Sequence, residues 1–222
     1  MPAHAPTFPP QRNLCTDCGL SRTAEPKRCG QACQFIQPDY PLWEQTVQGR
    51  SRQLDTDELF FGPHQAMWQA WLEPAHANAQ WSGIATSLAQ ALLEADEVDA
   101  VIAIEASPDD RWAPQPVVIT RAADMARCRG MRMGYAPLLA EIEPALAAGH
   151  KRLAVIGIPC QVYPLRAIEA SLRRDHGLQS LYVIGIPCSD NTTTEHFHRF
   201  LGLLSDRPQE IEYLEFRADY QV

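Results

Sequence analysis

The sequence lacks both a long apolar segment and any cluster of positive charge. Its most apolar stretches, Val98 to Ile104 and Leu153 to Ile158, have the length of strands and are too short to cross a bilayer. The N-terminus has no charged region followed by an apolar stretch, so we predict no secretory signal. The formal net charge is -8, and the basic residues stand singly or in pairs, so nucleic acid is not an expected partner. We therefore expect a cytoplasmic protein without a membrane span.

A regular apolar pattern is also missing from the first part of the chain. Residues 1–60 are rich in Pro, Gly, Arg and Gln, so we expect an irregular arm held by something other than a core. The whole chain has 222 residues and is 45% hydrophobic, enough for one domain with an appendage. We divide it into this arm, an α/β region at 61–150 and a β-α-β-α region at 151–222.

Seven cysteines are present, an odd number that cannot all pair in disulfides. Without a signal peptide, such cysteines indicate metal binding or catalysis in a reducing compartment. Four of them form the pattern C-x2-C-x10-C-x3-C: Cys15, Cys18, Cys29 and Cys33. No histidine lies within this quartet, and its spacing favours an iron–sulfur cluster, with structural zinc or thiols without metal as the alternatives. Cys128 stands between two arginines and is interpreted as a surface or packing residue.

The rest of the chain alternates between helical and strand patterns, which predicts an α/β fold with a parallel or mixed sheet and flanking helices. A helix is expected after Gly62, with Trp68 and Trp71 in the core. The other expected helices are 84–94, with Ser82 as a cap, and 138–148. The expected strands are 98–104, 117–119 and 153–156, with a polar loop at 108–116.

The octapeptides Leu153–Cys160 and Leu181–Cys188 are the same apart from Ala154 and Tyr182, and each precedes a helical pattern, at 165–174 and 194–204. Cys160 and Cys188 therefore follow strands at the sheet edge where α/β proteins bind ligands. Glycine allows close approach there, proline restricts the loop, and a nearby helix N-terminus favours thiolate. The alternative is a tight turn with a half-buried cysteine.

Three polar segments carry weaker signals. The segment 190–195 has side chains typical of a helix cap. Asp190, Glu195 and His196 are candidate proton donors, and the sequence does not select one of them. The segment 81–84 could hold a phosphate at a helix start. Arg129 and Arg132 could contact a phosphate or carboxylate, or simply be solvated.

Several motifs, in order along the chain, resemble the coenzyme F(420) hydrogenase/dehydrogenase beta-subunit family. Within it, the resemblance is to the chlorophyll branch, which contains divinyl chlorophyllide 8-vinyl reductases and 7-hydroxymethyl chlorophyll a reductases. The matching segments are the Cys15–Arg22 head with Cys29 and Cys33, Gly49–Arg52, Asp57–Gly62, Gln80–Ile84, Asp110–Pro116, Gly157–Gln161 with Leu165-Arg166, and Gly185–Asn191.

The resemblance implies an iron–sulfur flavoprotein in which FAD receives electrons from reduced ferredoxin through 4Fe-4S clusters and passes them to a tetrapyrrole. The expected reaction is reduction of the 8-vinyl group of divinyl (proto)chlorophyllide. Metal ligands implied by position are Cys15, Cys18, Cys29, Cys33 and Cys188. Cofactor contacts implied by position are Gln80, Trp81, Ser82, Gly83, Ile84, Gly157, Pro159, Cys160, Gln161, Asp190 and Asn191.

Other functions stay open at this point. The alternatives among enzymes are a 7-hydroxymethyl chlorophyll a reductase and a deazaflavin-linked hydrogenase/dehydrogenase beta subunit. The alternative of another class is an electron-transfer or zinc-stabilised binding subunit without its own substrate. Members of the branch extend beyond residue 222 with further cysteines, so we expect a C-terminally truncated fragment. A homo-oligomer is compatible with the sequence.

Overall fold

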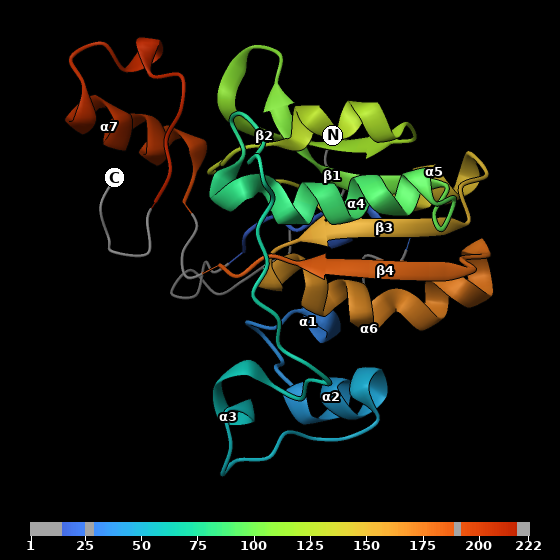
Figure 1. Cartoon of the computed structure of the whole chain (residues 1–222). Helices are drawn as coiled ribbons and strands as arrows, with labels where there is room; N and C mark the ends of the chain where they lie inside the picture. Colours follow the sequence, from blue (N-terminus) through green and yellow to red (C-terminus); the bar gives the residue numbers. More distant parts are fainter. Residues whose placement is uncertain (1–14, 25–28, 189–191, 217–222) are drawn as a thin grey trace.

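A computed structural model describes residues 15–24, 29–188 and 192–216 and shows a four-stranded sheet with helices on both faces (Figure 1). The strands are β1 (Ala100–Ser107), β2 (Asp110–Ile119), β3 (Arg152–Gly157) and β4 (Ser180–Gly185), in the order β2-β1-β3-β4. β1 pairs antiparallel with β2, whereas β1 with β3 and β3 with β4 are parallel. The predicted mixed α/β fold is confirmed. Because β1 pairs with β3, the proposed regions 61–150 and 151–222 contribute to one sheet.

Period-two alternation explains why the sheet has a core on each side. In β1, Ala100 and Ile102 face one core while Val101 and Ala103 face the other. β3 does the same with Leu153 and Val155 on one side and Ala154 on the other. Strands buried on both faces are expected of a parallel sheet covered by helices.

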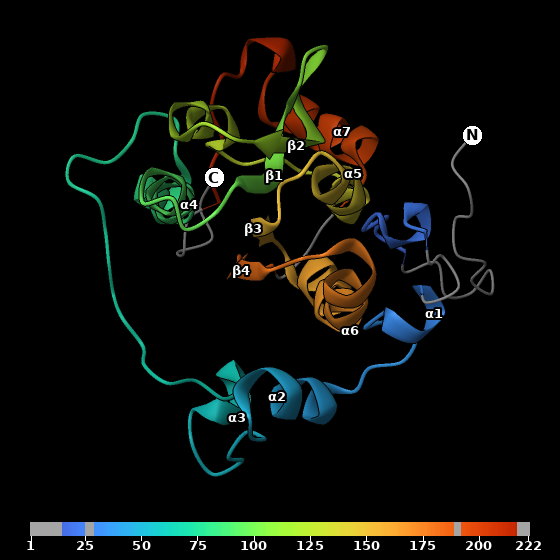
Figure 2. The same ribbon diagram turned by 90° about the vertical axis from the view of Figure 1, so that its right-hand side faces the viewer.

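The helices form two outer layers, which Figure 2 shows on opposite sides of the sheet. On one face lie α4 (Ile84–Glu94) and the 3-10 helix η5 (Ala122–Cys128). On the other lie η6 (Leu138–Glu141), α5 (Ile142–Ala147) and α6 (Pro159–His176). The predicted helices 84–94 and 138–148 are confirmed, the second as a 3-10 turn followed by an α-helix.

The predicted polar loop at 108–116 is wrong, because β2 already begins at Asp110. Only a short turn separates it from β1, and Ser107 pairs with Asp110. Pro114 and Pro116 lie inside β2, which is an edge strand of the described sheet. A proline is tolerated there because no neighbouring strand needs its missing N–H.

The described part of the N-terminal arm is more regular than predicted. It contains η2 (Leu20–Arg22), α1 (Cys29–Ala32), α2 (Tyr40–Gln48) and α3 (Glu58–Phe61). The side chains of Leu20, Cys29 and Ala32 also belong to a hydrophobic core. α2 and α3 lie apart from the sheet in both views, and α2 reaches α6 through Tyr163, whose ring meets Tyr40 and Trp43 edge-on.

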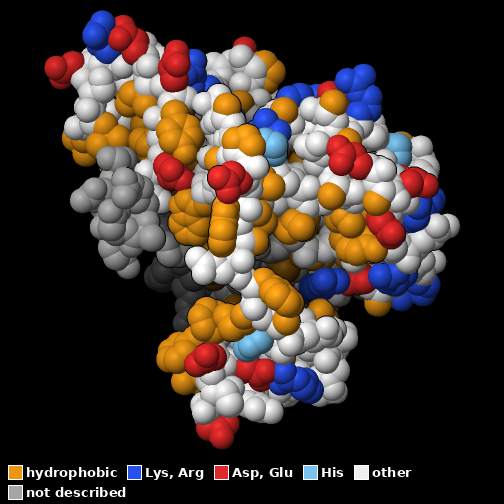
Figure 3. Space-filling model, in the orientation of Figure 1, with side chains coloured by type: hydrophobic (Ala, Val, Ile, Leu, Met, Phe, Trp, Pro, Cys, Tyr) orange, Lys and Arg blue, Asp and Glu red, His pale blue; other side chains and the backbone are white. Residues whose placement is uncertain are grey.

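The helix predicted after Gly62 is also wrong. Residues 62–79 form an extended connection from α3 to α4, and Trp68 and Trp71 are 88% and 67% exposed rather than in the core. Figure 3 shows apolar side chains over this part of the molecule. Helical spacing of apolar residues stabilises a helix only when a surface covers them, and here none of the described elements does.

The C-terminal part contains α7 (Thr194–Leu204), which matches the predicted helix, and η7 (Pro208–Glu210). Phe197 and Leu201 of α7 pack with Trp112, Met131 and Leu214 in a third, smaller core. Within the described residues, every helix is too short or too polar to cross a membrane.

Candidate functional site

The edge of the sheet where β3 and β4 end gathers most of the residues singled out in the sequence. α6 begins directly after the end of β3. α4 precedes β1 and runs antiparallel to it, so α4 also begins at this edge of the sheet (Figure 1). The two helices lie on opposite faces. The carboxyl edge of a parallel sheet is where such folds bind ligands.

The N-terminal arm reaches this region through a backbone contact at Gly19. Gly19 has φ 97°, and a Cβ there would lie 2.5 Å from the carbonyl oxygen of Pro137. Next to it, the backbone N–H of Leu139 donates to the carbonyl of Cys18 at 2.9 Å. A side chain at position 19 would separate the arm from η6, so glycine allows the first cysteine pair to dock.

A cavity lined by five cysteines forms where the arm meets α6, and we call it the cysteine cavity. Its lining consists of Cys15, Thr16, Cys18, Leu20, Cys29, Cys33, Phe35, Cys160 and Pro164. The structure thus brings the quartet together and adds Cys160 to it.

Two geometric facts bear on what the cysteine cavity could hold. Within the described residues, no three His, Cys, Asp or Glu side chains are arranged to hold one metal ion. The enclosed space is about 20 Å³, the size of a single water-sized group. Thiolates of an iron–sulfur cluster bind separate irons and can stand further apart than the ligands of one zinc ion. The number and type of thiols match the ligands of a cluster. As the described side chains are placed, however, binding of either a cluster or a zinc ion requires them to move.

Burial raises the pKa of four thiols of the cysteine cavity, Cys15, Cys18, Cys29 and Cys160, and so favours their protonated form. Burial raises the pKa of Cys18 to about 12, and the neighbouring cysteines act in the same direction. Burial also raises the pKa of Cys29 to about 11, again reinforced by other thiols of the cavity. Metal binding at this cavity would therefore release protons.

The segment Gly157–Gln161 forms the entry to α6 rather than a separate loop, since the helix begins at Pro159 and not at the predicted Leu165. Cys160 lies in its first turn. The Gln161 side chain is buried, accepts from the Ile158 N–H at 3.1 Å and donates to the Ala136 carbonyl at 3.1 Å. These contacts fix the turn that presents Cys160, and a flavin contact of Gln161 stays a prediction.

Cys188 follows β4 and is half-buried. It lies near enough to Cys160 for its charge to raise the pKa of that thiol, although burial is the larger cause. The predicted cofactor contacts Asp190 and Asn191 lie outside the described residues. The helix cap predicted in this region is provided by Thr193, whose hydroxyl accepts from the His196 N–H at 3.2 Å. Glu195 pairs with Arg199 on the exposed side of α7.

The segment Gln80–Ile84 makes an unusual turn before α4. Trp81, Ser82 and Gly83 have φ values of 46°, 67° and 91°, three successive residues in the left-handed region. The predicted capping role of Ser82 is wrong, because Gly83 is the cap residue and the Ser82 hydroxyl accepts from the Leu72 N–H instead. A non-glycine residue in the left-handed backbone conformation destabilises the fold by about 1–3 kcal/mol, and such residues concentrate at ligand-binding and catalytic sites.

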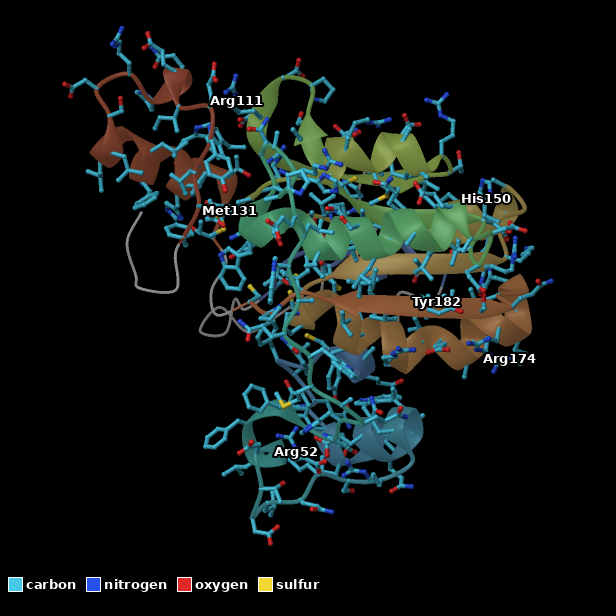
Figure 4. All side chains as sticks on the ribbon, in the orientation of Figure 1. Arg52, Arg111, Met131, His150, Arg174 and Tyr182 are labelled. Carbon is cyan, nitrogen blue, oxygen red and sulfur yellow. The ribbon has the colours of Figure 1, made fainter. Side chains whose placement is uncertain are left out.

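A second cavity, missed by sequence reasoning, lies beside this turn, and we call it the arginine cavity. Its volume is about 280 Å³, and its lining comes from four separate segments: Asn78, Arg111 and Trp112, Arg129 to Arg132, and Glu212 to Leu214. Arg111 and Met131 lie on the side of the molecule where α7 packs (Figure 4). The only sequence signal was the pair Arg129 and Arg132, and nothing local connects them with Arg111.

Hydrogen bonds connect the arginine cavity to the Gln80–Ile84 turn. The Tyr213 hydroxyl donates to the Ala79 carbonyl at 3.4 Å, and the Trp81 N–H donates to the Glu215 carboxylate at 2.8 Å. The C-terminal segment therefore holds the turn and closes one wall of the cavity. Cys128 is in neither cavity; it packs against the core beneath α4, as expected for a packing cysteine.

Comparison with known proteins gives two family matches. The N-terminal part of the coenzyme F420 hydrogenase/dehydrogenase beta subunit matches residues 67–143, and the C-terminal part matches residues 150–222. Together these matches cover more than half of the chain.

Among individual proteins, the chain is 37% identical over 214 residues to an uncharacterized protein of Nostoc sp., covering 96% of this chain and 53% of that protein. It is 36% identical over 216 residues to the chloroplastic 7-hydroxymethyl chlorophyll a reductase of Oryza sativa subsp. japonica, covering 96% of this chain and 45% of the enzyme. The chain thus spans about half the length of these curated relatives.

A solved structure of the F420-reducing [NiFe] hydrogenase complex from Methanosarcina barkeri contains a chain of similar fold. The TM-score is 0.58 at 24% sequence identity, covering 64% of this chain and 50% of that one. This likeness concerns the fold alone. On the two family matches and the 36% identity to the rice enzyme, the chain belongs to the coenzyme F420 hydrogenase/dehydrogenase beta-subunit family, in its chlorophyll branch, and is related to oxidoreductases.

Proposed function

We propose that the protein is an iron–sulfur flavoprotein reductase that uses reduced ferredoxin to reduce a tetrapyrrole of the chlorophyll pathway. The first candidate reaction is reduction of the 8-vinyl group of divinyl (proto)chlorophyllide. Membership of an oxidoreductase family supports the reaction class. The five thiols of the cysteine cavity form no disulfides, which suits a reducing compartment such as the cytoplasm.

The observation that carries the proposal is the convergence of Cys15, Cys18, Cys29 and Cys33 with Cys160 on one cavity. The quartet comes from the arm and Cys160 from α6, so folding creates the donor set. Four cysteine thiolates are the usual ligands of a 4Fe-4S cluster. Five are available here, and Cys188 lies beside Cys160.

Two segments at the carboxyl edge support a flavin site. The Gln80–Ile84 turn opens α4, and Gly157–Gln161 opens α6 on the other face of the sheet. When both cofactors are bound, the cluster would supply electrons one at a time, and the flavin would store the two electrons that reduction of a vinyl group requires. The role of this chain would be to hold the thiols, keep the Gln80–Ile84 turn strained and exclude water.

A second candidate substrate is 7-hydroxymethyl chlorophyll a. The 36% identity to the rice enzyme of that name over 96% of this chain favours it. Both candidate reactions take up two electrons and two protons. The first saturates the vinyl group, whereas the second breaks the C–O bond of the hydroxymethyl group and releases water.

The cluster is tested by anaerobic expression of the chain, followed by iron and sulfide analysis and electron paramagnetic resonance after dithionite reduction. We expect iron, sulfide and visible absorbance in the wild type, and loss of most of the iron in Cys18→Ser. Cys128→Ser is the matched control and should keep its iron, because Cys128 lies outside the cavity. Bound zinc with no iron would overturn the proposal.

Single serine variants at the five positions identify the ligands further. If the cavity holds one cluster, four variants lose iron and one retains it, and the retained one marks the thiol that is not a ligand.

Substrate choice is tested by incubating iron-loaded protein with reduced ferredoxin and either divinyl chlorophyllide or 7-hydroxymethyl chlorophyll a. Conversion of the first to its monovinyl form supports the first candidate, and conversion of the second alone supports the other. If neither pigment is converted, the tetrapyrrole assignment is wrong, whereas the iron analysis still decides the cluster.

A further inference from the structure

The arginine cavity combines positive charge with an apolar floor. Arg111, Arg129 and Arg132 line it, and Glu212 is its one acidic residue. Its floor contains Trp112 and Met131, both members of the small core beneath α7. Three guanidinium groups gathered in one hollow are notable in a chain with a formal net charge of -8.

The guanidinium groups of this cavity are incompletely satisfied. The Nε atoms of Arg129 and Arg132 are buried and, within the described part of the chain, have no hydrogen-bond partner. The remaining contacts are to backbone: Arg132 Nη1 donates to the Met131 carbonyl at 2.7 Å, and Arg111 Nη1 to the Ile211 carbonyl at 3.2 Å. A buried N–H without a partner costs free energy, and a charged group costs more.

Arginines elsewhere in the molecule differ. Arg50 pairs with Glu58, Arg152 with Asp96 and Asp99, and Arg166 with Glu169. Among the described residues, none of the three arginines of the cavity forms an ion pair. Burial is the main cause that lowers the pKa of Arg132; Cys128 acts against it, and the nearby charge of Arg111 acts in the same direction as burial. Glu212 also lines the cavity but, within the described residues, forms no ion pair with any of the three arginines, so these cations are brought together without a paired carboxylate.

The backbone around the arginines is fixed by a glycine. Gly130 has φ 87°, and a Cβ there would lie 3.0 Å from the Asn78 carbonyl and 3.1 Å from Arg132 Nη1. The turn that carries Arg129 and Arg132 thus packs closely against the segment leading to the Gln80–Ile84 turn. The backbone that carries the two arginines is therefore fixed before any ligand arrives, which lowers the entropic cost of binding.

We propose that the arginine cavity binds an oxyanion, a phosphate or carboxylate group carried by a molecule with an apolar or planar body. Guanidinium groups match the geometry of these anions and bind them through charge-assisted hydrogen bonds. The apolar floor of Trp112 and Met131 suits the body of the ligand. Two ligands could supply the anion: the diphosphate of a flavin dinucleotide or the carboxylate of a tetrapyrrole. The anion site is argued from the geometry of the cavity, and only the choice between these two ligands rests on the proposed function.

The test is a titration of the metal-free chain with inorganic pyrophosphate and, separately, with propionate, in a buffer free of other oxyanions. Thermal unfolding and isothermal titration calorimetry report the binding. We expect saturable binding by the wild type that is at least about tenfold weaker in Arg129→Gln and Arg132→Gln, equivalent to about 1.4 kcal/mol. Arg121→Gln is the matched control, since Arg121 is an exposed arginine paired with Asp124 on η5.

The two ligands distinguish the sources. Saturable binding of pyrophosphate alone indicates a diphosphate, and of propionate alone a carboxylate; both outcomes support the site. Absence of binding by either anion, or equal affinity in Arg132→Gln and Arg121→Gln, overturns it. Iron is not needed for this measurement, so failure of the cluster proposal would not affect the result.

Stability in the absence of anions separates a binding role from a structural one. If Arg132 exists to bind a ligand, Arg132→Met should leave thermal stability unchanged or raise it, because it removes a poorly satisfied buried charge. A clear loss of stability in Arg132→Met without any loss of pyrophosphate or propionate binding would assign the residue to packing and contradict the proposal.

Discussion

The octapeptides Leu153–Cys160 and Leu181–Cys188 lie side by side as neighbouring parallel strands. Leu153 pairs with Leu181, and the register continues to Gly157 with Gly185. The first repeat is covered on both sides, with β1 as a further neighbour, whereas the second is the edge strand of the described sheet. Nearly identical sequences therefore differ in burial, and the difference lies in what surrounds them.

The same contrast applies to their cysteines. Cys160 lies in the first turn of an 18-residue helix and in the cysteine cavity. Cys188 follows β4 outside that cavity lining, although it is close to Cys160. A repeated motif thus leads to two chemical positions, because the arm docks beside only one of them.

The largest expected difference between the repeats is at their first leucine. Leu153 is 0% exposed, whereas Leu181 is only partly buried against the same core. Leu153→Ala should lower the free energy of unfolding by about 2–5 kcal/mol, and Leu181→Ala by clearly less. Urea denaturation of both variants measures this. Equal losses would show that the edge strand is as well covered as the central one.

The glycines provide a sharper comparison, since only one has close neighbours. A Cβ at Gly157 would lie 3.3 Å from Leu138 Cδ2, whereas one at Gly185 would have nothing within 4 Å. Gly157→Val should cost about 1–3 kcal/mol through overpacking, and Gly185→Val less than about 0.5 kcal/mol. Thermal unfolding of the two variants tests this. A destabilising Gly185→Val would reveal a neighbour of β4 outside the described residues.

Asp99, just before β1, binds Lys151 and Arg152 at the start of β3. This charged contact makes the stability of the protein depend on pH. Burial works against ionisation of Asp99, but hydrogen bonds from Arg152 and the Lys151 N–H outweigh it and lower the pKa of Asp99. A lowered pKa in the folded state means that the carboxylate stabilises the protein above its unfolded pKa, near 3.9, and loses this effect as pH falls through the folded pKa.

Asp99→Asn should therefore cost about 1.5 kcal/mol at pH 7. The difference from wild type should shrink below about pH 4. Denaturant titrations at pH 7, 5 and 3 measure it. A difference that stays constant over this range would mean that the charge of Asp99 does not contribute.

Much of the fold was predictable because local patterns decide it. The short apolar run Val98 to Ile104 predicts a strand, and the two octapeptides, each followed by a helical pattern, predict parallel strands. The 84–94 helix follows its apolar spacing. The helix predicted after Gly62 is wrong, although the spacing of its apolar residues was equally regular. Spacing cannot show whether another element covers an apolar face, and Trp68 remains exposed.

The candidate sites divide in the same way. The sequence by itself determined the cysteine quartet, the two strand-end cysteines and the family, because these depend on residue type and short spacing. Only the tertiary structure decided that Cys160 joins the quartet and that Arg111 meets Arg129 and Arg132 in one cavity. Those contacts join segments far apart in the chain, and their formation depends on the packing of the whole sheet, which local sequence does not encode.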